Sequence, residues 1–155
     1  MLEDLRASGL EFIVCGGIAA ILHGVERSTL DIHLSVSLIS LLITALEHVG
    51  LEPRLPLEPH MLGKPAFVKS MLEEKQAVVF TFFHPKKRYL HLDIFIKPEL
   101  SYDNLKPFSE AIPFRGASLL VLTAVKLLEL KEGIDPPRSK DKINIEILRQ
   151  LVEKR

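Results

Sequence analysis

Two short segments of the 155-residue chain, 30–36 and 89–96, alternate apolar and polar side chains and carry groups that could bind a metal ion. Alternate residues of a β-strand lie on the same face, so each segment predicts a strand with one apolar and one polar face. The polar faces carry Asp31, His33 and Ser35 in the first segment and His91 and Asp93 in the second. If the two strands are neighbours in a sheet, two carboxylates and as many as two imidazoles converge on one surface.

Carboxylates that converge from neighbouring strands can hold a divalent cation for phosphoryl chemistry, because Mg²⁺ prefers hard oxygen ligands. We therefore predict that Asp31, His33 and Asp93 ligate a metal ion, with Asp31 and Asp93 as the catalytic residues. The alternative is an inactive surface, on which Asp31 faces solvent and His33 is a solvated histidine. His91 is placed near the predicted site by its position in the strand, although a surface histidine is the simpler interpretation.

A glycine pair stands at the end of the first buried strand. The apolar run Phe12–Cys15 predicts a strand buried on both faces, and Gly16 and Gly17 end it before a short helix. Such a turn can bring backbone amides close to a phosphate group at the positive end of a helix dipole, although a tight turn alone also explains a glycine pair. Arg27 and Thr29 follow shortly before the first polar strand, and a forked guanidinium suits phosphate recognition.

The remaining pattern predicts the order strand, helix, strand, helix, hairpin and C-terminal helices. Helices are expected at residues 2–8, 18–23, 38–49, 66–73, 119–131 and 140–154, with Ser118 capping the fifth. Strands are expected at residues 12–15, 30–36, 77–83, 89–96 and 111–115, with the third and fourth forming a hairpin and the last at a sheet edge. Four prolines between residues 51 and 65 predict a loop.

This order predicts one domain spanning residues 1–155 with an α/β (α+β) fold, in which a mixed sheet is flanked by helices and the C-terminus is helical. Hydrophobic residues make up 47% of the chain and the formal net charge is zero, which argues against a strongly basic nucleic-acid-binding protein. The basic run 86–88 could still contact nucleic acid locally, although a solvated hairpin turn is the simpler interpretation.

The single cysteine, Cys15, excludes an internal disulfide framework, and its apolar surroundings predict a buried, unreactive thiol. The first six residues are charged and lack the apolar core of a signal peptide. The apolar runs are too short or too interrupted to span a bilayer. We therefore expect a soluble, cytoplasmic protein with no membrane partner.

The segment 14–34 resembles the opening of the nucleotidyltransferase superfamily, in particular the AbiEii-like and minimal nucleotidyltransferases of bacteria and archaea. That opening has a glycine pair, a small-residue helix, H-G, R-x-T and D-x-D, and it is matched by Gly16, Gly17, Ala19, His23, Gly24, Arg27, Thr29 and Asp31. The family's third acidic residue lies between hydrophobic residues of a later strand, as Asp93 does. A looser likeness covers a lysine-bearing helix and an R-x-K-D segment, matched by Lys126, Arg138, Lys140 and Asp141.

The resemblance implies a nucleotidyltransferase-like fold and the transfer of a nucleoside monophosphate from a nucleoside triphosphate to an acceptor hydroxyl, with Mg²⁺ or Mn²⁺ as cofactor. Gly16, Gly17, Arg27, Thr29 and Lys126 would then bind the triphosphate. The acceptor could be RNA, a protein or a small molecule, and a partner protein of the toxin–antitoxin kind is also implied. Lys126 lies on an otherwise apolar helix, so its side chain either reaches the triphosphate or extends to solvent.

The chain departs from the family's pattern at His33, which stands where the second aspartate of D-x-D is expected. A neutral imidazole removes one negative charge from the site, and a unit charge pair about 4 Å apart is worth about 4 kcal/mol at an effective dielectric of about 20. Imidazole suits Mn²⁺ or Zn²⁺ better than Mg²⁺. Asn144 stands where such proteins often carry another acid. These departures predict weakened or altered metal binding, and they motivate a second hypothesis: a catalytically decayed domain that binds a nucleotide or a partner protein.

Overall fold

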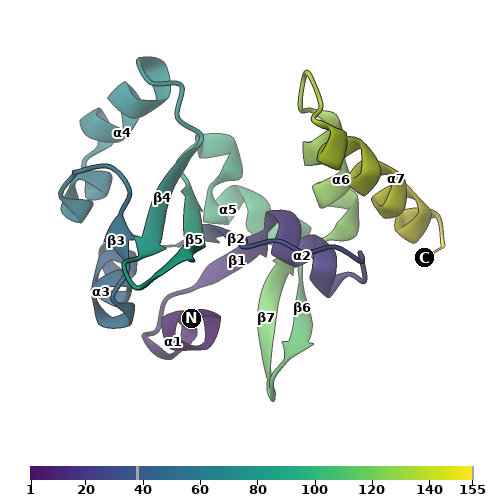
Figure 1. The fold of residues 1–155 in the computed structure, drawn as a ribbon, viewed down its shortest axis with the longest axis horizontal. Helices are drawn as coiled ribbons and strands as arrows, with labels where there is room; N and C mark the ends of the chain where they lie inside the picture. The colour runs from purple at the N-terminus through teal and green to yellow at the C-terminus, as the bar shows by residue number, and fades with distance from the viewer. Residues whose placement is uncertain (38, 155) are drawn as a thin grey trace.

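The structure is a computed structural model that describes residues 1–37 and 39–154. Its described part contains one seven-stranded mixed sheet in the order β3-β4-β5-β2-β1-β7-β6 (Figure 1). The strands are β1 Phe12–Cys15, β2 Asp31–Val36, β3 Glu52–Pro53, β4 Val79–His84, β5 Lys87–Phe95, β6 Ser109–Phe114 and β7 Ala117–Leu122. The predicted α/β fold with a mixed sheet is therefore confirmed.

Helices lie at both ends of this sheet and also beside its central strands (Figure 1). The α-helices are α1 Leu2–Ala7, α2 Gly16–Leu22, α3 Ile39–Val49, α4 Pro65–Glu73, α5 Tyr102–Leu105, α6 Ala124–Glu132 and α7 Ser139–Glu153. The short 3₁₀ helices are η1 Pro59–Gly63, η2 Pro98–Leu100 and η3 Lys106–Phe108. Helices α3 and α4 lie at the β3–β5 end of the molecule, whereas α6 and α7 lie together at the opposite end (Figure 1). No helix within the described ranges has the length and apolar character needed to cross a membrane.

The central strands form a sheet because their apolar side chains fill one continuous core. Leu34 of β2, Phe82 of β4 and Leu92 and Ile94 of β5 are fully buried. The alternation predicted for β2 and β5 is confirmed, since these residues lie opposite the polar face in each strand. Each such side chain contributes roughly 1.5–3 kcal/mol by leaving water, so the register of the two strands is strongly specified.

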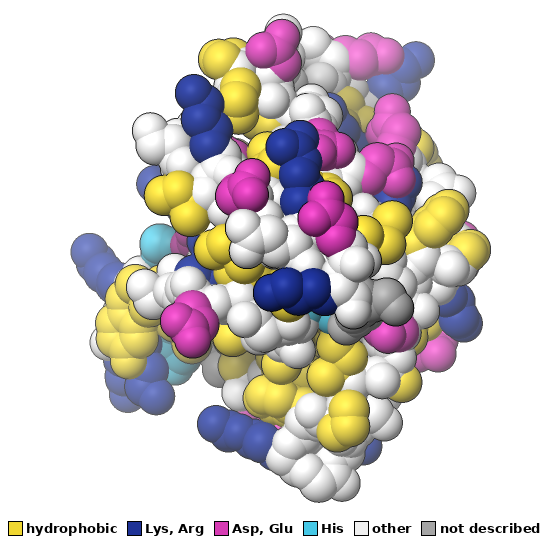
Figure 2. Space-filling model, turned by 90° about the vertical axis from the view of Figure 1, so that its right-hand side faces the viewer, with side chains coloured by type: hydrophobic (Ala, Val, Ile, Leu, Met, Phe, Trp, Pro, Cys, Tyr) yellow, Lys and Arg dark blue, Asp and Glu magenta, His cyan; other side chains and the backbone are white. Residues whose placement is uncertain are grey.

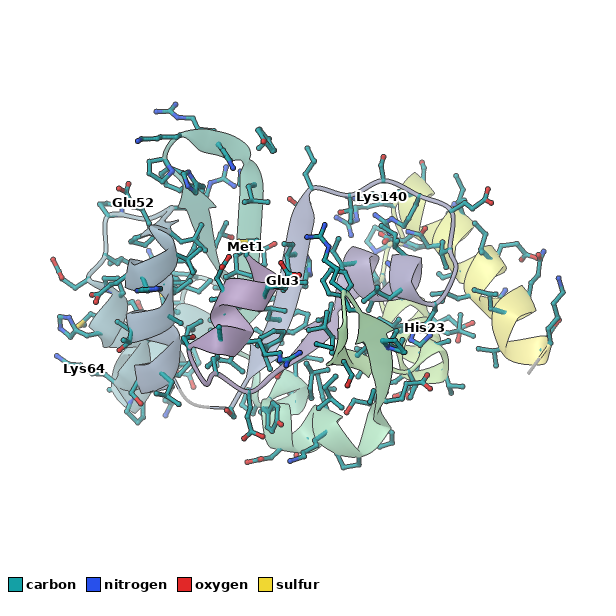
Figure 3. The ribbon with its side chains drawn as sticks, turned by 90° about the horizontal axis from the view of Figure 1, so that it is seen from below. Met1, Glu3, His23, Glu52, Lys64 and Lys140 are labelled. Atoms are coloured by element: carbon teal, nitrogen blue, oxygen red, sulfur yellow. The ribbon has the colours of Figure 1, made fainter. Side chains whose placement is uncertain are left out.

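Cys15 and His23 both lie buried in the core, as predicted for Cys15. Cys15 is buried, and the loss of solvent around the thiol raises its pKa to about 12. The imidazole of His23 is buried at the end of α2, and its Nε2 atom lies 2.8 Å from the carbonyl oxygen of Leu122 in β7. Figure 3 shows His23 beside the β6–β7 hairpin. Both residues therefore serve the packing of the fold.

The predicted helix over residues 119–131 is wrong in its first part. Residues 117–122 form β7, which pairs with β6, and α6 begins only at residue 124. The turn between these strands is Arg115-Gly116, and both residues have positive φ angles, as a two-residue hairpin loop of type I′ requires. The apolar residues 119–122 are compatible with either a strand or a helix. The hairpin turn pairs them with β6, so they form a strand. Thr123, rather than the predicted Ser118, caps the helix.

The other predicted elements differ mainly at their ends. The predicted helix 38–49 corresponds to α3, and its first residue lies outside the described residues. The predicted edge strand 111–115 corresponds to β6, which does lie at the edge of the sheet. The proline-rich stretch 51–65 contains the two-residue strand β3 and the 3₁₀ helix η1 in addition to loop.

Candidate functional site

The two polar strands identified from the sequence are direct neighbours. Strands β2 and β5 run parallel, with Asp31 opposite His91 and His33 opposite Asp93. Because these positions alternate with the buried apolar ones, all four side chains share one face of the sheet. The structure therefore brings together the carboxylates and imidazoles that the alternation pattern singled out.

Each carboxylate of this group is paired with an imidazole. His33 Nε2 lies 3.1 Å from Asp93 Oδ2, and His91 Nδ1 lies 3.4 Å from Asp31 Oδ1. Thr81 of β4 donates a hydrogen bond of 2.6 Å to the other oxygen of Asp93. The two carboxylates differ in exposure, since the side chain of Asp31 is 46% exposed and that of Asp93 only 15%.

The pKa of Asp93 is lowered from its ordinary value. Burial by itself raises this pKa, but the hydrogen bonds from His33 and Thr81 and the nearby imidazoles outweigh that effect. Asp93 is therefore anionic at neutral pH, and both of its oxygens are bound by groups of the chain itself.

The ring of His33 is held on three sides. It meets the ring of Phe95 edge to face, with centroids 5.8 Å apart, and it binds Asp93 as described. On the third side lies Gly16, where an added Cβ would approach the His33 ring to 3.0 Å. Gly16 also has a φ of +62°, which favours glycine on its own. The first glycine of the pair thus makes room for His33.

The second glycine makes room for the loop that precedes β2. A Cβ on Gly17 would lie 3.0 Å from the methyl group of Thr29 and 3.2 Å from the guanidinium carbon of Arg27. Thr29 Oγ1 in turn accepts a hydrogen bond of 3.4 Å from the backbone amide of Asp31. Two of the predicted phosphate-binding residues, Arg27 and Thr29, therefore lie against Gly17 at the beginning of α2.

The opposite wall is built from the junction of α6 and α7. The Asp141 side chain is only 1% exposed, and it binds Lys131 Nζ at 3.3 Å and Arg138 Nε at 2.7 Å. It also accepts the backbone amide of Arg138 and so caps α7. The pKa of Asp141 is lowered, first by its bond to Arg138 and, against the opposing effect of burial, also by Lys131.

Lys131 faces other cations as well as Asp141. Burial lowers the pKa of its ammonium, the bond to Asp141 raises it, and the positive charges of Arg27 and Arg138 lower it further, so that the net direction is down. Arg27, from the glycine-turn side, and Lys131, from α6, are therefore close enough to repel one another. Cations held together in this way favour an anionic ligand between them.

A cavity of about 500 Å³ lies between the two walls. Asp31, His33, Asp93, Gly16, Gly17, Arg27 and Thr29 line it from the sheet side. Lys97 follows β5, and Lys131, Arg138, Lys140 and Asp141 line the cavity from the helical side. Figure 3 shows Lys140 at the beginning of α7, far from Lys64 and Glu52 at the other end of the molecule.

Lys126 is the one predicted phosphate-binding residue that does not line this cavity. Its ammonium pairs with Glu129 at 2.6 Å and lies 4.7 Å from the centre of the Phe108 ring. Lys131 is the lysine of α6 that faces the cavity instead. Five residues of an α-helix correspond to a rotation of about 140°, so the two lysines lie on different faces. If the beginning of α6 at Thr123 were known from the sequence, the helical periodicity would predict that Lys126 and Lys131 lie on different faces.

The donor groups do not fit a divalent-metal centre. Within residues 1–37 and 39–154, no group of three or more His, Cys, Asp or Glu side chains is arranged to hold a metal ion. No buried side-chain nitrogen or oxygen of these residues lacks a hydrogen-bond partner either. Both oxygens of Asp93 are bound within the chain, and Asp141 is bound by two cations. The metal roles of Asp31, His33 and Asp93 stay predictions that this arrangement does not support.

A second cavity of about 720 Å³ adjoins the first, and the two share Phe95 and Lys97. Its other lining residues come from the end of β2, the start of α3, η1, α4 and the segment 96–101 that follows β5. The basic run 86–88 lines neither cavity. On the face at the α6–α7 end, acidic and basic side chains are interspersed among apolar ones, which argues against a broad basic surface there (Figure 2).

The chain was compared with known proteins. No family model and no curated protein matches it. Among solved structures, it is similar to the lincosamide antibiotic adenylyltransferase LnuA bound to lincomycin, with a TM-score of 0.64 and 16% identity over 97% of this chain and 92% of that one. The antibiotic-resistance factor ANT(2'')-Ia matches with a TM-score of 0.60 and 12% identity over 99% of this chain and 85% of that one.

A third similar structure is an antigenic nucleotidyltransferase-like protein from Paracoccidioides brasiliensis, with a TM-score of 0.59 and 15% identity over 96% of this chain and 72% of that one. Identities this low establish the fold and nothing finer. The AbiEii-like branch suggested by residues 14–34 stays a prediction. The chain has the fold of the nucleotidyltransferases.

Proposed function

We propose that the 500 Å³ cavity binds the phosphate groups of a nucleoside triphosphate. The observation that carries this proposal is the convergence of five cationic side chains on one cavity: Arg27, Lys97, Lys131, Arg138 and Lys140. They come from loops and helices at opposite walls, so a single anionic ligand can bind several of them at once. Only three carboxylates share the lining, and one of these, Asp141, is already bound by two of the cations.

The size of the cavity and the fold support a nucleotide as the source of those phosphates. Ligand pockets of about 300–1,000 Å³ hold small molecules of nucleotide size. Proteins that share this fold include an adenylyltransferase, which by its name transfers an adenylyl group. Apolar side chains of the lining, among them Leu127, Leu130 and Ile134, offer a surface for a base or ribose beside the cations.

In this proposal, the residues that line the cavity have different roles in binding the phosphate groups. The planar guanidinium of Arg27, packed against Gly17, presents two parallel donors to a phosphate. Lys131 supplies a compact positive charge from the opposite wall. Asp141 positions Lys131 and the Arg138 side chain, because it binds both. In a transferase, a divalent metal ion would supply charge neutralisation and the activation of a hydroxyl.

Replacing Lys131 tests the proposal, and Lys126 of the same helix is the matched control. We expect Lys131→Ala to weaken the binding of ATP or GTP at least about tenfold, equivalent to about 1.4 kcal/mol, whereas Lys126→Ala leaves it within about twofold. Isothermal titration calorimetry measures both, and the midpoint of thermal unfolding shows whether each variant is folded. Equal affinity in the two variants, or no binding of either nucleotide by the unaltered protein, would contradict the proposal.

Nucleotidyl transfer to an acceptor hydroxyl is a second candidate function. It is favoured by Asp31 and Asp93, which lie on the same face of neighbouring strands beside the cavity. The adjoining 720 Å³ cavity would receive the acceptor, since the two spaces meet at Phe95 and Lys97. Pyrophosphate release that disappears in Asp93→Ala would favour this function, and its absence with Mg²⁺ and with Mn²⁺ would leave nucleotide binding alone.

A further inference from the structure

We propose that the nucleotide binds in this cavity without a divalent metal ion, because cations of the chain and the His33–Asp93 pair occupy the place of one. This inference rests on the proposed nucleotide binding and goes beyond it. Three arrangements support it: the bonds of Asp93, the enclosure of His33, and the distribution of charge around the cavity.

Asp93 has no oxygen left without a partner in the chain. Oδ2 lies 3.1 Å from His33 Nε2, and Oδ1 accepts the Thr81 hydroxyl at 2.6 Å. A metal ion at this carboxylate would have to displace or share one of these bonds. Because the Asp93 side chain is only 15% exposed, a metal ion bound to it would also have to lose much of its own hydration shell.

Neighbouring groups confine the ring of His33. Its ring is enclosed by the glycine turn at Gly16 and by Phe95, and its Nε2 atom already binds Asp93. The residue that stands where the family's pattern has an aspartate thus binds a neighbouring carboxylate through its Nε2 atom. This arrangement exchanges a metal ligand for a hydrogen-bond partner of Asp93.

Asp31 remains as the open carboxylate of the group, and it faces His91. Asp31 alone supplies the minimum of the one or two carboxylates that Mg²⁺ usually takes together with substrate phosphates. Asp141, the third carboxylate of the cavity, is bound to Lys131 and Arg138. The five cationic side chains of the lining meanwhile supply the positive charge that a polyphosphate requires.

The decisive experiment titrates the protein with ATP in the presence of EDTA and, separately, of excess Mg²⁺ or Mn²⁺, and also with Mn²⁺ alone. For the unaltered protein we expect the affinity for ATP in EDTA to equal that in Mg²⁺ within about twofold, and Mn²⁺ alone not to bind at the cavity. An increase of about tenfold or more on addition of metal would overturn the inference and leave the proposed function standing. No binding of ATP under any of these conditions would overturn the proposed function itself.

Two variants of His33 of similar size separate the effect of charge from that of shape. His33→Asp restores a carboxylate beside Asp93, so we expect Mn²⁺ alone to bind and ATP binding to become metal-dependent by about tenfold or more. His33→Asn adds no charge, and its binding of ATP should stay independent of metal. Identical metal dependence in the two variants would overturn the role given to His33. The measurements on the unaltered protein decide the inference even if His33→Asp fails to fold.

Discussion

The carboxylates on the two walls of the cavity differ in their partners and in their exposure. On the strand wall, Asp31 and Asp93 face the imidazoles of His91 and His33. On the helical wall, Asp141 faces the ammonium of Lys131 and the guanidinium of Arg138. Asp141 is also the more buried of the three, with 1% exposure against 15% for Asp93 and 46% for Asp31.

Because of this difference, we expect the ion pairs of the helical wall to matter most for stability and the pairs of the strand wall to matter most for binding. Removing the charge of a deeply buried acid leaves its cationic partners uncompensated, and such losses are large. The strand wall holds weaker, partly exposed pairs, whose change alters binding chemistry more than folding. On the helical wall, Asp141 therefore holds Lys131 and Arg138 in place. In our proposal, the pairs on the strand wall determine whether nucleotide binding also requires a divalent metal ion.

The largest expected effect on stability is that of Asp141→Asn. We expect it to lower the free energy of unfolding by about 3 kcal/mol, because Lys131 then keeps a buried charge without an acidic partner. For a chain of this size, that corresponds to a fall of about 6–12 °C in the midpoint of thermal unfolding. Asp93→Asn, the matched substitution on the strand wall, should cost only about 1–2 kcal/mol, because an amide can still pair with Thr81.

Denaturant unfolding followed by circular dichroism measures both variants. The comparison between the walls fails if Asp93→Asn proves as destabilising as Asp141→Asn. It would also fail if Asp141→Asn were neutral, since the two ion pairs would then contribute nothing to the anchoring of α7.

A second, smaller effect concerns the glycine turn. Gly16→Ala should destabilise the protein by at least about 1 kcal/mol more than Gly9→Ala. Both glycines have positive φ angles, but an added Cβ meets nothing within 4 Å at Gly9 and the His33 ring at 3.0 Å at Gly16. The strain of the backbone is thus common to the two variants, and their difference reports the contact with His33. Equal losses in chemical denaturation would mean that the His33 ring moves away at no cost.

The strand wall could be predicted from the sequence because its information is local. Alternation fixes which side chains share a face, and the apolar residues of β2 and β5 leave one register that buries them. The neighbouring placement of Asp31, His33 and Asp93 follows from that pattern once the strands pair. The contact between Gly16 and His33 could not be read from it, because it joins a turn to a strand through space.

The helical wall was harder to predict because it depends on where a helix begins. The apolar residues 119–122 fit a strand as well as a helix, and the sheet partner β6 selects the strand. That choice sets the faces of α6 and brings Lys131, rather than Lys126, to the cavity. The R-x-K-D segment is visible in the sequence, but the pairing of its Asp141 with a lysine of the preceding helix depends on the packing of α6 against α7.

The smallest expected effect is the response of the two walls to acid. The pKa values of Asp93 and Asp141 are both lowered from 3.8. A carboxyl group with a depressed pKa in the folded state contributes stability above its unfolded pKa and loses it as the pH falls through the folded value. The destabilisation by Asp141→Asn should therefore be full at about pH 6 and shrink as the pH falls below about 3.8, with a smaller change for Asp93→Asn. Urea unfolding of the three proteins at about pH 6 and about pH 3 measures these differences. If the difference in the free energy of unfolding between Asp141→Asn and the unaltered protein stayed the same in acid, the variant would lose packing and not a charge interaction. The two walls would then differ in side-chain packing and not in electrostatics.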